Sequence, residues 1–410
     1  MAPKSVKGSN VPNLRFPGFE EDWVTKKFAE VGVFFKGTGI SKDKLTENGN
    51  PCILYGELYT KYKNEVIKEV FSKTDINPKG LVSSKANDII IPSSGESAVD
   101  IATACCVNMN DVLLGGDLNV IRPYKDNGNF ISYQLNGKRK LEIAKIAQGS
   151  SVTHLYNGSL QKLKINLPSN INEQDKIASL LSIIDDRIAT QNKIIQQLET
   201  LIKGIGEKLF SQKIRFKEFI GEWELKKLGE VFYSEKGKGL SKDKLTVNGE
   251  YECVLYGELY TKYKEVILNV VSKTNEDDGF KSQIGDLLIP SSTTTTGIDL
   301  ANVTAINKEN VLLGGDITVL RSREKINNVF YAYYLSNYKK EEMASYAQGS
   351  TIVHLYYSHI KDMAINFPSF EEQNKISQFL LSIDAKIQTE KNLLDKYQSQ
   401  KQYLLQNLFI

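Results

Sequence analysis

The sequence predicts an α/β (mixed α+β) protein with two tandem globular domains, separated by two long helices that form an antiparallel coiled coil. Three observations predict this fold. The chain repeats itself, each repeat opens with short β-rich runs, and each repeat closes with apolar residues spaced as in a coiled coil. At 410 residues the chain is too long for one ordinary core, so two or three domains are expected.

The internal repeat is visible in several short segments. YGELYTKY at residues 55–62 returns unchanged at residues 256–263. Further pairs are SKDKLT at 41–46 and 241–246, LLGGD at 113–117 and 312–316, and AQGS at 147–150 and 347–350. The offset is 199 to 201 residues throughout, which indicates one domain-sized unit present twice, related by a pseudo-two-fold axis.

The first part of each repeat has the composition of a globular domain. Residues 88–92 (DIIIP) and 286–290 (DLLIP) are short apolar runs next to turn residues, as in buried strands, and residues 141–147 have a helical pattern. The expected boundaries are an N-terminal segment over 1–19, a domain over 20–168, a helical spacer over 169–211, a linker over 212–220, a second domain over 221–368 and a second spacer over 369–410.

Each spacer carries an apolar seam with 4-3 spacing over five heptads. The seam residues are Ile177, Leu181, Ile184, Ile188, Gln191, Ile195, Leu198, Ile202, Ile205 and Leu209, and then Ile376, Leu380, Ile383, Ile387, Glu390, Leu394, Tyr397, Lys401, Leu404 and Leu408. From Glu173 to Phe210 such a helix would be about 57 Å long. Packing of each helix on its own domain is the alternative, but a period of 3.5 without drift favours a partner helix, and the other repeat supplies one.

Composition excludes several classes of protein. The formal net charge is +3, with 41% hydrophobic and 25% charged residues, which is ordinary for a globular protein and weak evidence for nucleic acid. The four cysteines form no C-x-x-C pair and the chain has three histidines, so no metal site is expected. No apolar run is long enough to span a membrane, and we expect a cytoplasmic protein with reduced thiols and no membrane partner.

The sequence lacks the motifs of an enzyme. It contains neither a G-x-x-x-x-G-K-[ST] phosphate loop nor a methyl-donor loop, so no cofactor and no catalytic residue is assigned. Cys52 and Cys253, at equivalent positions, are expected to be small buried residues. His154 and His354 are also equivalent, and a single histidine is more often a hydrogen-bonding residue than a catalyst.

Tyrosine and lysine alternate in the most closely repeated segment. These types together suit contact with a nucleic-acid backbone, because lysine supplies charge and tyrosine supplies a hydroxyl and a ring. The candidate residues are Tyr55, Tyr59, Lys61 and Tyr62, and in the second repeat Tyr256, Tyr260, Lys262 and Tyr263. An edge strand with tyrosine in the core and lysine in water is the alternative that the period-2 pattern favours.

Two polar loops in each repeat are candidates for contact with DNA. The first is a candidate for reading bases, because small hydroxyls and amides reach base edges and Glu can accept from cytosine. The first loop supplies Ser93, Ser94, Glu96 and Ser97, and its counterpart supplies Ser292, Thr293 and Thr294. The second supplies Gln148, Ser150 and His154, and its counterpart supplies Gln348, Ser350 and His354. The alternatives are a polar turn for the first loop and support of the junction with the helix for the second.

Two further motifs carry a family resemblance. Each repeat opens with an Arg-Phe…Trp segment, at residues 15–23 and 215–223, and closes with a helix that starts Pro-Ser…Glu-Gln, at residues 168–174 and 368–373. With the duplicated architecture, these motifs resemble the specificity subunits of type I restriction-modification systems over the whole chain. The two globular domains of this chain are more alike than is usual in that family.

The resemblance implies a role and partners. The globular domains would be target recognition domains, each reading one half-site of a split double-stranded DNA target, and the helices would be spacers. The partners would be two DNA adenine methyltransferase subunits and ATP-dependent restriction/translocase subunits. These subunits would methylate or cleave DNA in defence against phage. We expect the methyltransferase to bind apolar residues outside the seam: Leu180, Ile194, Leu201, Phe379 and Leu393.

Two other functions remain open at this point. One is the specificity chain of a related restriction system in which nuclease and methyltransferase are fused. The other is a coiled-coil assembly scaffold that binds proteins and not DNA. Sequence-dependent and salt-sensitive binding to DNA distinguishes the scaffold from the readers of DNA.

Overall fold

The computed structural model describes residues 10–62, 64–149 and 151–410, which divide into two compact units. Unit 1 comprises the described residues up to Lys193 together with Lys391–Ile410, and unit 2 comprises Ile194–Glu390. Each unit therefore contains one globular domain, half of one long helix and half of the other. None of the helices in the described part of the chain is long and apolar enough to cross a membrane.

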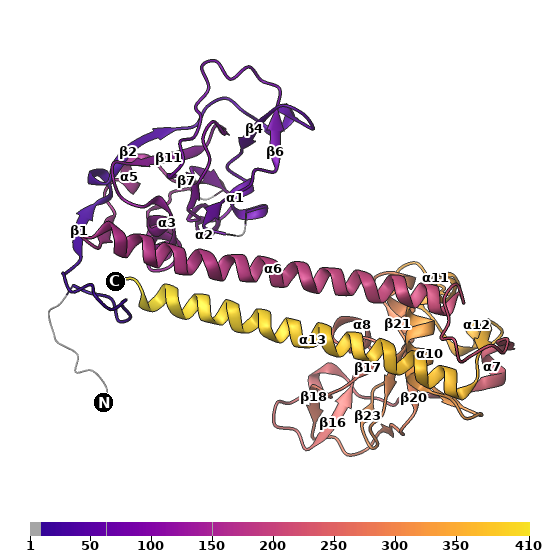
Figure 1. Ribbon diagram of the computed structural model, residues 1–410. Coiled ribbons are helices and arrows are strands. Elements are labelled where there is room, and N and C mark those ends of the chain that lie inside the picture. Colours follow the sequence, from indigo (N-terminus) through magenta and orange to yellow (C-terminus); the bar gives the residue numbers. More distant parts are fainter. Residues whose placement is uncertain (1–9, 63, 150) are drawn as a thin grey trace. The chain divides into compact units, whose positions relative to one another are not determined.

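The domain of unit 1 is built on a five-stranded mixed sheet (Figure 1). Its strands in spatial order are β2 (Gly32–Lys36), β11 (Leu118–Pro123), β7 (Asp88–Pro92), β9 (Cys105–Val107) and β5 (Val66–Ile67). The neighbouring strands from β2 through β11 and β7 to β9 pair antiparallel, and β5 pairs parallel with β9. All five residues of β7 are buried, so the strand predicted from the DIIIP run is confirmed.

Smaller sheets and short helices complete the domain of unit 1. A four-stranded sheet has the order β10 (Leu113–Leu114), β4 (Asn50–Ile53), β6 (Ser72–Thr74) and β3 (Leu45–Thr46). Two-stranded sheets pair β1 (Val24–Lys27) with β13 (Lys164–Leu167), and β8 (Ser94–Gly95) with β12 (Thr153–His154). The helices are α1 (Glu57–Thr60), α2 (Ala98–Ile101), α3 (Gly128–Asn136), α4 (Lys140–Ile146) and α5 (Asn157–Leu160), with 3-10 turns η1 (Phe28–Glu30) and η2 (Lys42–Lys44).

Unit 2 repeats this topology except in its four-stranded sheet, where the fourth strand pairs with β23 (Leu312–Leu313) at one edge, whereas β3 of unit 1 pairs with β6 at the other edge. Its five-stranded sheet has the order β15 (Phe232–Lys236), β24 (Ile317–Ser322), β20 (Asp286–Pro290), β22 (Thr304–Ile306) and β17 (Val266–Ile267). The smaller sheets are β18 (Ser272–Thr274), β16 (Tyr251–Val254), β23 (Leu312–Leu313) and β19 (Phe280–Lys281), then β14 (Glu224–Lys227) with β26 (Ala364–Phe367), and β21 (Ser292–Thr293) with β25 (Val353–His354). The helices are α7 (Leu228–Val231), α8 (Glu258–Thr261), α9 (Gly297–Leu300), α10 (Asn328–Tyr333), α11 (Lys340–Ser345) and α12 (Tyr357–Ile360), with 3-10 turn η3 (Lys242–Lys244) and π-helical turn η4 (Tyr334–Tyr338).

The two long helices are α6 (Ile171–Phe210) and α13 (Phe370–Asn407), close to their predicted bounds. In unit 1 they run antiparallel, because Asp185 contacts Lys401 and, further along α6, Arg187 contacts Tyr397. In unit 2, Leu209 and Phe210 of α6 share a core with Ile376 and Leu380 of α13. The seam residues are buried or half-buried, so the predicted antiparallel pairing is confirmed in each unit.

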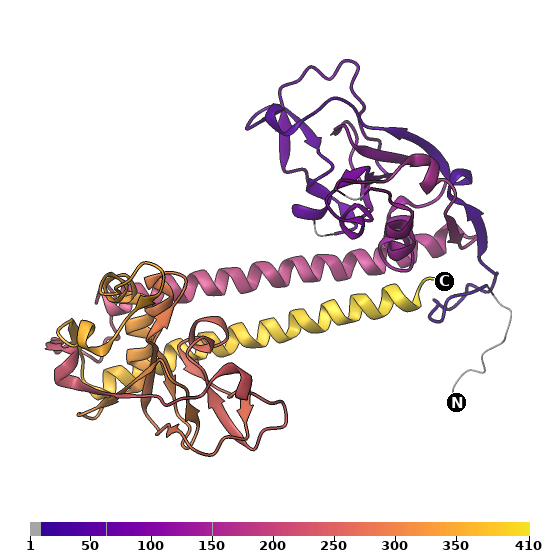
Figure 2. The ribbon, with the colours of Figure 1, turned by 180° about the vertical axis from the view of Figure 1, so that it is seen from behind.

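Each helix half also packs on a domain. In unit 1, both long helices contribute to the core that contains the sheet residue Ile89. The contributing residues are Ile177 and Leu181 of α6, and Leu404 and Leu408 of α13. The C-terminal end of the chain lies beside the start of α6 in both views, and Phe409 contacts Phe130 of α3 with ring centroids 5.1 Å apart (Figures 1 and 2). Packing between the helices and packing on the domain therefore occur together.

The Arg-Phe…Trp and Glu-Gln motifs meet where each long helix begins. Arg15 makes two hydrogen bonds to the buried carboxylate of Glu173, at 2.7 and 2.9 Å, and the Trp23 indole N–H donates to the same carboxylate. Gln174 accepts from the backbone N–H of Asn127 and donates to Asp126. Arg215, Trp223 and Glu372 repeat the arrangement in unit 2. These motifs therefore fix each domain to its own helix.

The edge-strand alternative for the YGELYTKY segment is wrong. Residues Glu57–Thr60 form α1 and residues Glu258–Thr261 form α8. The Glu57 carboxylate accepts from the Leu54 backbone N–H at 2.9 Å, from the Lys61 ammonium at 2.6 Å and from the Ser72 hydroxyl. Glu258 makes the same three contacts in unit 2. This network closes the turn, and it gives Glu57 and Lys61 of the repeated segment a structural role.

Candidate nucleic-acid interface

Three segments that are far apart in the sequence meet in unit 1. Strand β8 pairs with β12, so that Ser94 lies opposite His154. The Tyr59 hydroxyl of α1 lies beside the same strand, since a Cβ atom at Gly95 would come within 3.4 Å of it. We refer to α1 with its preceding turn, residues 93–97, and residues 148–149 and 151–156 as the three-segment site of unit 1. The site gathers residues from all the segments that the sequence predicted for DNA contact.

Unit 2 has the corresponding arrangement. Ser292 lies opposite His354, and Thr293 lies opposite Val353. Helix α8, which carries Tyr260, packs beside β20, the strand that leads into β21. We refer to α8 with its preceding turn, residues 292–296 and residues 348–356 as the three-segment site of unit 2.

The predicted contact residues divide by exposure. Most of them are exposed or half-buried. In unit 1 these are Tyr55, Tyr59, Lys61, Glu96, Ser97, Gln148 and His154. In unit 2 they are Tyr256, Tyr260, Lys262, Tyr263, Thr294, Gln348, Ser350 and His354. Tyr62, Ser93, Ser94, Ser292 and Thr293 are buried. Ser150 lies outside the described residues. The exposed residues are placed where a duplex could reach them, whereas the buried ones lie behind the surface.

The buried hydroxyl residues have structural partners. The Ser93 backbone N–H donates to the Asp117 carbonyl at 2.7 Å, and the Ser292 hydroxyl donates to the Asp316 carboxylate at 3.0 Å. The half-buried Ser97 is the N-cap of α2, where its hydroxyl accepts from the Asp100 N–H at 3.1 Å. In the first loop, Glu96 and its counterpart Thr294 are exposed and differ between the units. Their side chains therefore reach the surface of the loop.

Tyr59 is the central polar group of the unit 1 site. The pKa of its hydroxyl is raised, chiefly because the side chain is partly buried, and further because Tyr55, Asp100 and Glu96 lie nearby. The hydroxyl therefore stays protonated at neutral pH, and it can donate a hydrogen bond to a phosphate oxygen or a base acceptor.

The AQGS loop requires glycine. Gly149 has φ +122°, and a Cβ atom there would lie 2.0 Å from the Val152 carbonyl oxygen; Gly349 has φ +117° and the same conflict with Ile352. The turn is closed by two backbone hydrogen bonds between Gln148 and His154. Glycine at these positions therefore holds each exposed glutamine beside its histidine.

Sequence reasoning missed one pair of residues in this site. Tyr156 and Tyr356 are 48% and 38% exposed, and each stacks on the preceding histidine, with centroids 6.1 Å apart at His154 and 5.3 Å apart at His354. The Tyr356 hydroxyl also lies 3.0 Å from Nδ1 of His354. The repeated His-Leu-Tyr sequence was the available signal, and an exposed aromatic ring supported by a histidine is a surface on which a base or sugar can stack.

The described residues offer neither a reactive thiol nor a cluster that could hold a metal. All four cysteines are free and buried, as expected for Cys52 and Cys253. Burial raises the pKa of the Cys52 and Cys253 thiols to about 11 and raises that of Cys105 and Cys106 as well, so they are protonated and unreactive at neutral pH. Among the described residues, no three His, Cys, Asp or Glu side chains are grouped to hold a metal.

Two like domains, each fixed to the start of a long helix and each carrying a polar and aromatic surface, define a duplicated recognition protein. Comparison with known proteins gives the family. Residues 20–200 and 220–397 each match the type I restriction modification DNA specificity domain. The chain therefore belongs to this family, in which the specificity subunit is non-catalytic, and the prediction that the chain is not an enzyme is confirmed.

Individual relatives cover almost the whole chain. The type I restriction enzyme MjaVIII specificity subunit of Methanocaldococcus jannaschii is 25% identical over 411 residues, which cover 96% of this chain and 92% of the relative. The crystal structure of the type I restriction-modification S subunit from M. genitalium superposes with a TM-score of 0.65 at 19% identity, covering 98% of this chain and 99% of that one. A chain from a study of assembly and conformational transition of the type I R-M system gives 0.57 at 14% identity, covering 97% and 99%. These likenesses confirm the predicted fold.

Proposed function

We propose that this chain reads a bipartite double-stranded DNA target for a type I restriction-modification complex, with one half-site for each three-segment site. The proposed contacts are the exposed and half-buried predicted residues of these sites, together with Tyr156 and Tyr356. Tyr62, Ser93, Ser94, Ser292 and Thr293 support the surface from behind. The recognition domains are assigned to residues 20–168 and 221–368, with spacers at 169–211 and 369–410.

One observation carries this proposal: the same types of side chain meet at the same place in both units. The hydroxyl group of tyrosine and the amide group of glutamine can form hydrogen bonds with phosphate oxygens and base edges. An exposed aromatic ring offers a surface for stacking. Glu96 in unit 1 and Thr294 in unit 2 differ within otherwise similar sites. A carboxylate accepts from cytosine N4, whereas a threonine hydroxyl can also donate, so the half-sites are expected to differ by a small number of base pairs.

Methyltransferase and restriction subunits are the proposed partners, acting on DNA in the cytoplasm. Leu180 and Phe379, which we expected to bind the methyltransferase, instead pack on the cores of their own units; Phe379 contacts Phe216 with centroids 5.9 Å apart. Leu201 remains 49% exposed, and Ile183 is 54% exposed on α6. Ile183 lines an open groove of about 430 Å³ between α6 and α13 with Arg187 and Tyr397. These exposed residues are the revised docking residues, Ile183 with its groove in unit 1 and Leu201 in unit 2.

The assembled complex with its methyltransferase tests DNA reading directly. The preferred sequence is selected from a random DNA library, and binding to it is then measured by fluorescence anisotropy. Tyr156→Ala should weaken binding by about 1–3 kcal/mol, the usual scale of one specific contact to a base edge in duplex DNA. Because Tyr156 belongs to unit 1, the loss should disappear on DNA in which its own half-site is scrambled. Tyr356→Ala should behave in the same way for the other half-site.

Tyr124→Ala is the matched control, since Tyr124 is 67% exposed and lies outside the three-segment site. Its complex should bind like the wild type. Absence of any selected sequence would favour the protein-binding scaffold instead. Equal losses from Tyr124→Ala and Tyr156→Ala would show that the three-segment site is not the contact surface.

A further inference from the structure

Each AQGS turn carries an exposed apolar side chain two residues before its histidine. Val152 is 51% exposed, and its repeat equivalent Ile352 is 49% exposed. The residues just before them, Ser151 and Thr351, are polar and exposed. One exposed apolar residue is ordinary on a protein surface. Here a β-branched apolar residue recurs at the same position of both three-segment sites, which indicates a shared role.

The backbone of the turn holds this side chain in a defined place. In unit 1, the His154 N–H donates to the Gln148 carbonyl at 2.6 Å, and the Gln148 N–H donates to the His154 carbonyl at 2.9 Å. The same two bonds close the turn of unit 2. A β-branched side chain also has few accessible rotamers. Val152 and Ile352 therefore lose little conformational freedom when a partner covers them.

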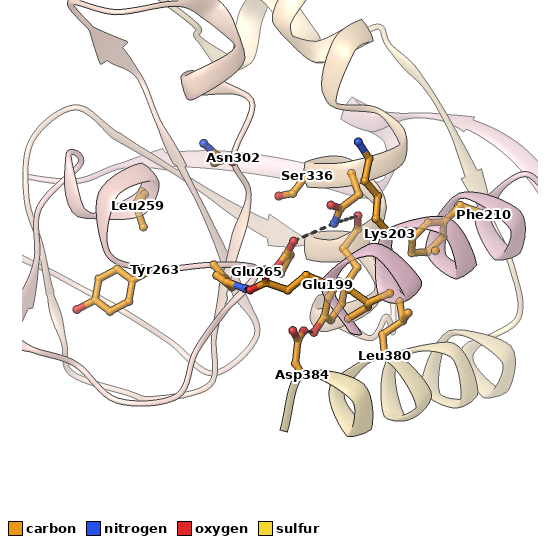
Figure 3. A pocket seen from close by; sticks show the side chains of 15 residues that line it. Glu199, Lys203, Phe210, Leu259, Tyr263, Glu265, Asn302, Ser336, Leu380 and Asp384 are labelled. Carbon is orange, nitrogen blue, oxygen red and sulfur yellow. Dashed lines mark hydrogen bonds and ion pairs between the residues drawn. The ribbon is translucent and has the colours of Figure 1, made fainter. Parts of the chain in front are cut away.

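The apolar residue of unit 2 is exposed on an open surface. A pocket of about 320 Å³ lies elsewhere in this unit, between the globular domain and the two long helices (Figure 3). Leu259 of α8 and Tyr263 line it together with residues of α6 and α13, and none of its lining residues comes from residues 348–356. Ile352 is thus half exposed outside this pocket, where a large partner such as a duplex can reach it.

The neighbours of the apolar residue indicate which chemical group fits it. In unit 1, Gln148 and His154 lie at the two ends of the turn, and their amide and imidazole groups can form hydrogen bonds with base edges. The fitting group is therefore apolar and lies among hydrogen-bonding groups. In the major groove of DNA, the 5-methyl group of thymine is the apolar group on the base edges.

We propose that Val152 and Ile352 each pack on the 5-methyl group of a thymine, so that each half-site contains a thymine that is read through its methyl group. This inference rests on the proposed function and adds to it one base and one specificity-determining residue for each unit. Packing removes apolar surface of both the side chain and the methyl group from water, which favours thymine over cytosine at that position.

The experiment uses the full chain in complex with its methyltransferase, and the DNA sequence that this complex selects from a random library. Each thymine of the selected sequence is replaced in turn by deoxyuridine, which lacks the methyl group and keeps every hydrogen-bonding group of the base. Binding is measured by fluorescence anisotropy. One replacement in each half-site should weaken binding about fourfold, which corresponds to about 0.8 kcal/mol, the usual contribution of one buried CH₂ group.

Substitutions then assign each methyl group to a residue. Val152→Ser removes the apolar surface, so deoxyuridine in the half-site of unit 1 should no longer weaken binding, whereas deoxyuridine in the other half-site still should. Ile352→Ser should do the reverse. Val33→Ser is the matched control, because Val33 is a valine with 49% exposure on β2, outside the three-segment site. Its complex should respond to deoxyuridine in both half-sites like the wild type.

Several results would overturn the reading of thymine while the proposed function stands. One is a selected sequence without thymine in one half-site, and another is a wild type that binds every deoxyuridine variant as tightly as the thymine sequence. Unchanged sensitivity to deoxyuridine in both Val152→Ser and Ile352→Ser would also overturn it, because other residues would then contact the methyl groups. Loss of methyltransferase co-purification from Val152→Ser would place this residue in a protein interface instead. Absence of any selected sequence would contradict both the inference and the proposed function.

Discussion

At the scale of single residues, burial decides the chemistry of the cysteine thiols. Cys52 and Cys253 are fully buried, and each has a pKa of about 11. At pH 8 only about one thiol in a thousand would then be a thiolate, the reactive form. We therefore predict that none of the four cysteines reacts with Ellman's reagent in the native protein at pH 8 and that all four react after unfolding. Rapid reaction of one native thiol would contradict this.

The raised pKa of these thiols also predicts how the free energy of unfolding depends on pH. An unperturbed thiol titrates near 9.0, below the folded pKa of Cys52 and Cys253. The stability that these protonated thiols contribute is therefore fully present below pH 9 and is lost as the pH rises toward about 11. Cys52→Ser with Cys253→Ser should flatten the fall in unfolding free energy over that interval, measured in urea.

At the scale of elements, the long helices have two kinds of apolar residue. The seam residues are buried or half-buried between helices and domains, whereas Ile183 and Leu201 of α6 are exposed. Exposed apolar side chains on a helix that is already packed on one side suit a further helical partner. We predict that Ile183→Glu and Leu201→Glu each prevent co-purification of the methyltransferase while leaving the circular dichroism of the chain unchanged.

Gln400→Glu is the matched control for these substitutions, because Gln400 is an exposed polar residue of α13. It adds the same charge outside the proposed docking residues, and its chain should co-purify normally. If the complex survives both Ile183→Glu and Leu201→Glu, the methyltransferase binds elsewhere on this chain.

At the scale of the whole molecule, the two units are built from equivalent parts. Each has a globular domain, the first half of the helix that follows it and the second half of the other helix. A pseudo-two-fold axis between like domains, as the repeat predicts, would make them read like bases on opposite strands. We predict that the methylated motif, determined by methylome sequencing of a host with the chain and its methyltransferase, consists of two similar half-sites in inverted orientation around an unread gap.

A domain graft sharpens this prediction. Replacing residues 221–368 by a copy of residues 20–168 should give a motif with two identical inverted half-sites. A continuous motif, or half-sites without an inverted relationship, would show that the likeness of the two domains reflects a shared scaffold alone.

Periodic and repeated features of this protein could be predicted from its sequence. The long helices, their seam and strand β7 follow from residue spacing, because spacing along one element fixes which side chains share a face. The YGELYTKY segment alternates like a strand, yet it forms a helix. Contacts of the Glu57 carboxylate with Leu54, Lys61 and Ser72 override the local pattern, and Ser72 belongs to a distant strand.

The composition of the candidate site could be predicted only in part. Its segments were recognisable by their polar residues, but their meeting depends on the pairing of β8 with β12, about 60 residues apart. Ser94 is buried within β8, whereas Tyr156 follows β12 and is exposed. The local sequence does not show which side of the paired strands faces water. Tyr156 was therefore not predicted as a contact residue, whereas the buried Ser93 and Ser94 were.

The core of unit 1 has a consequence for how the chain folds during synthesis. Leu404, Leu408 and Phe409 pack against residues of the first domain and of the first half of α6. The ribosome makes the first domain early, yet those partners emerge only after about 200 further residues, or about 10–40 s at ordinary rates of translation. During that interval the apolar surface around Phe130 and Ile177 faces solvent or a chaperone. The domain synthesised first is therefore the one whose core is completed last, and a nonsense mutation late in the gene would damage the N-terminal domain as well as the C-terminal helix.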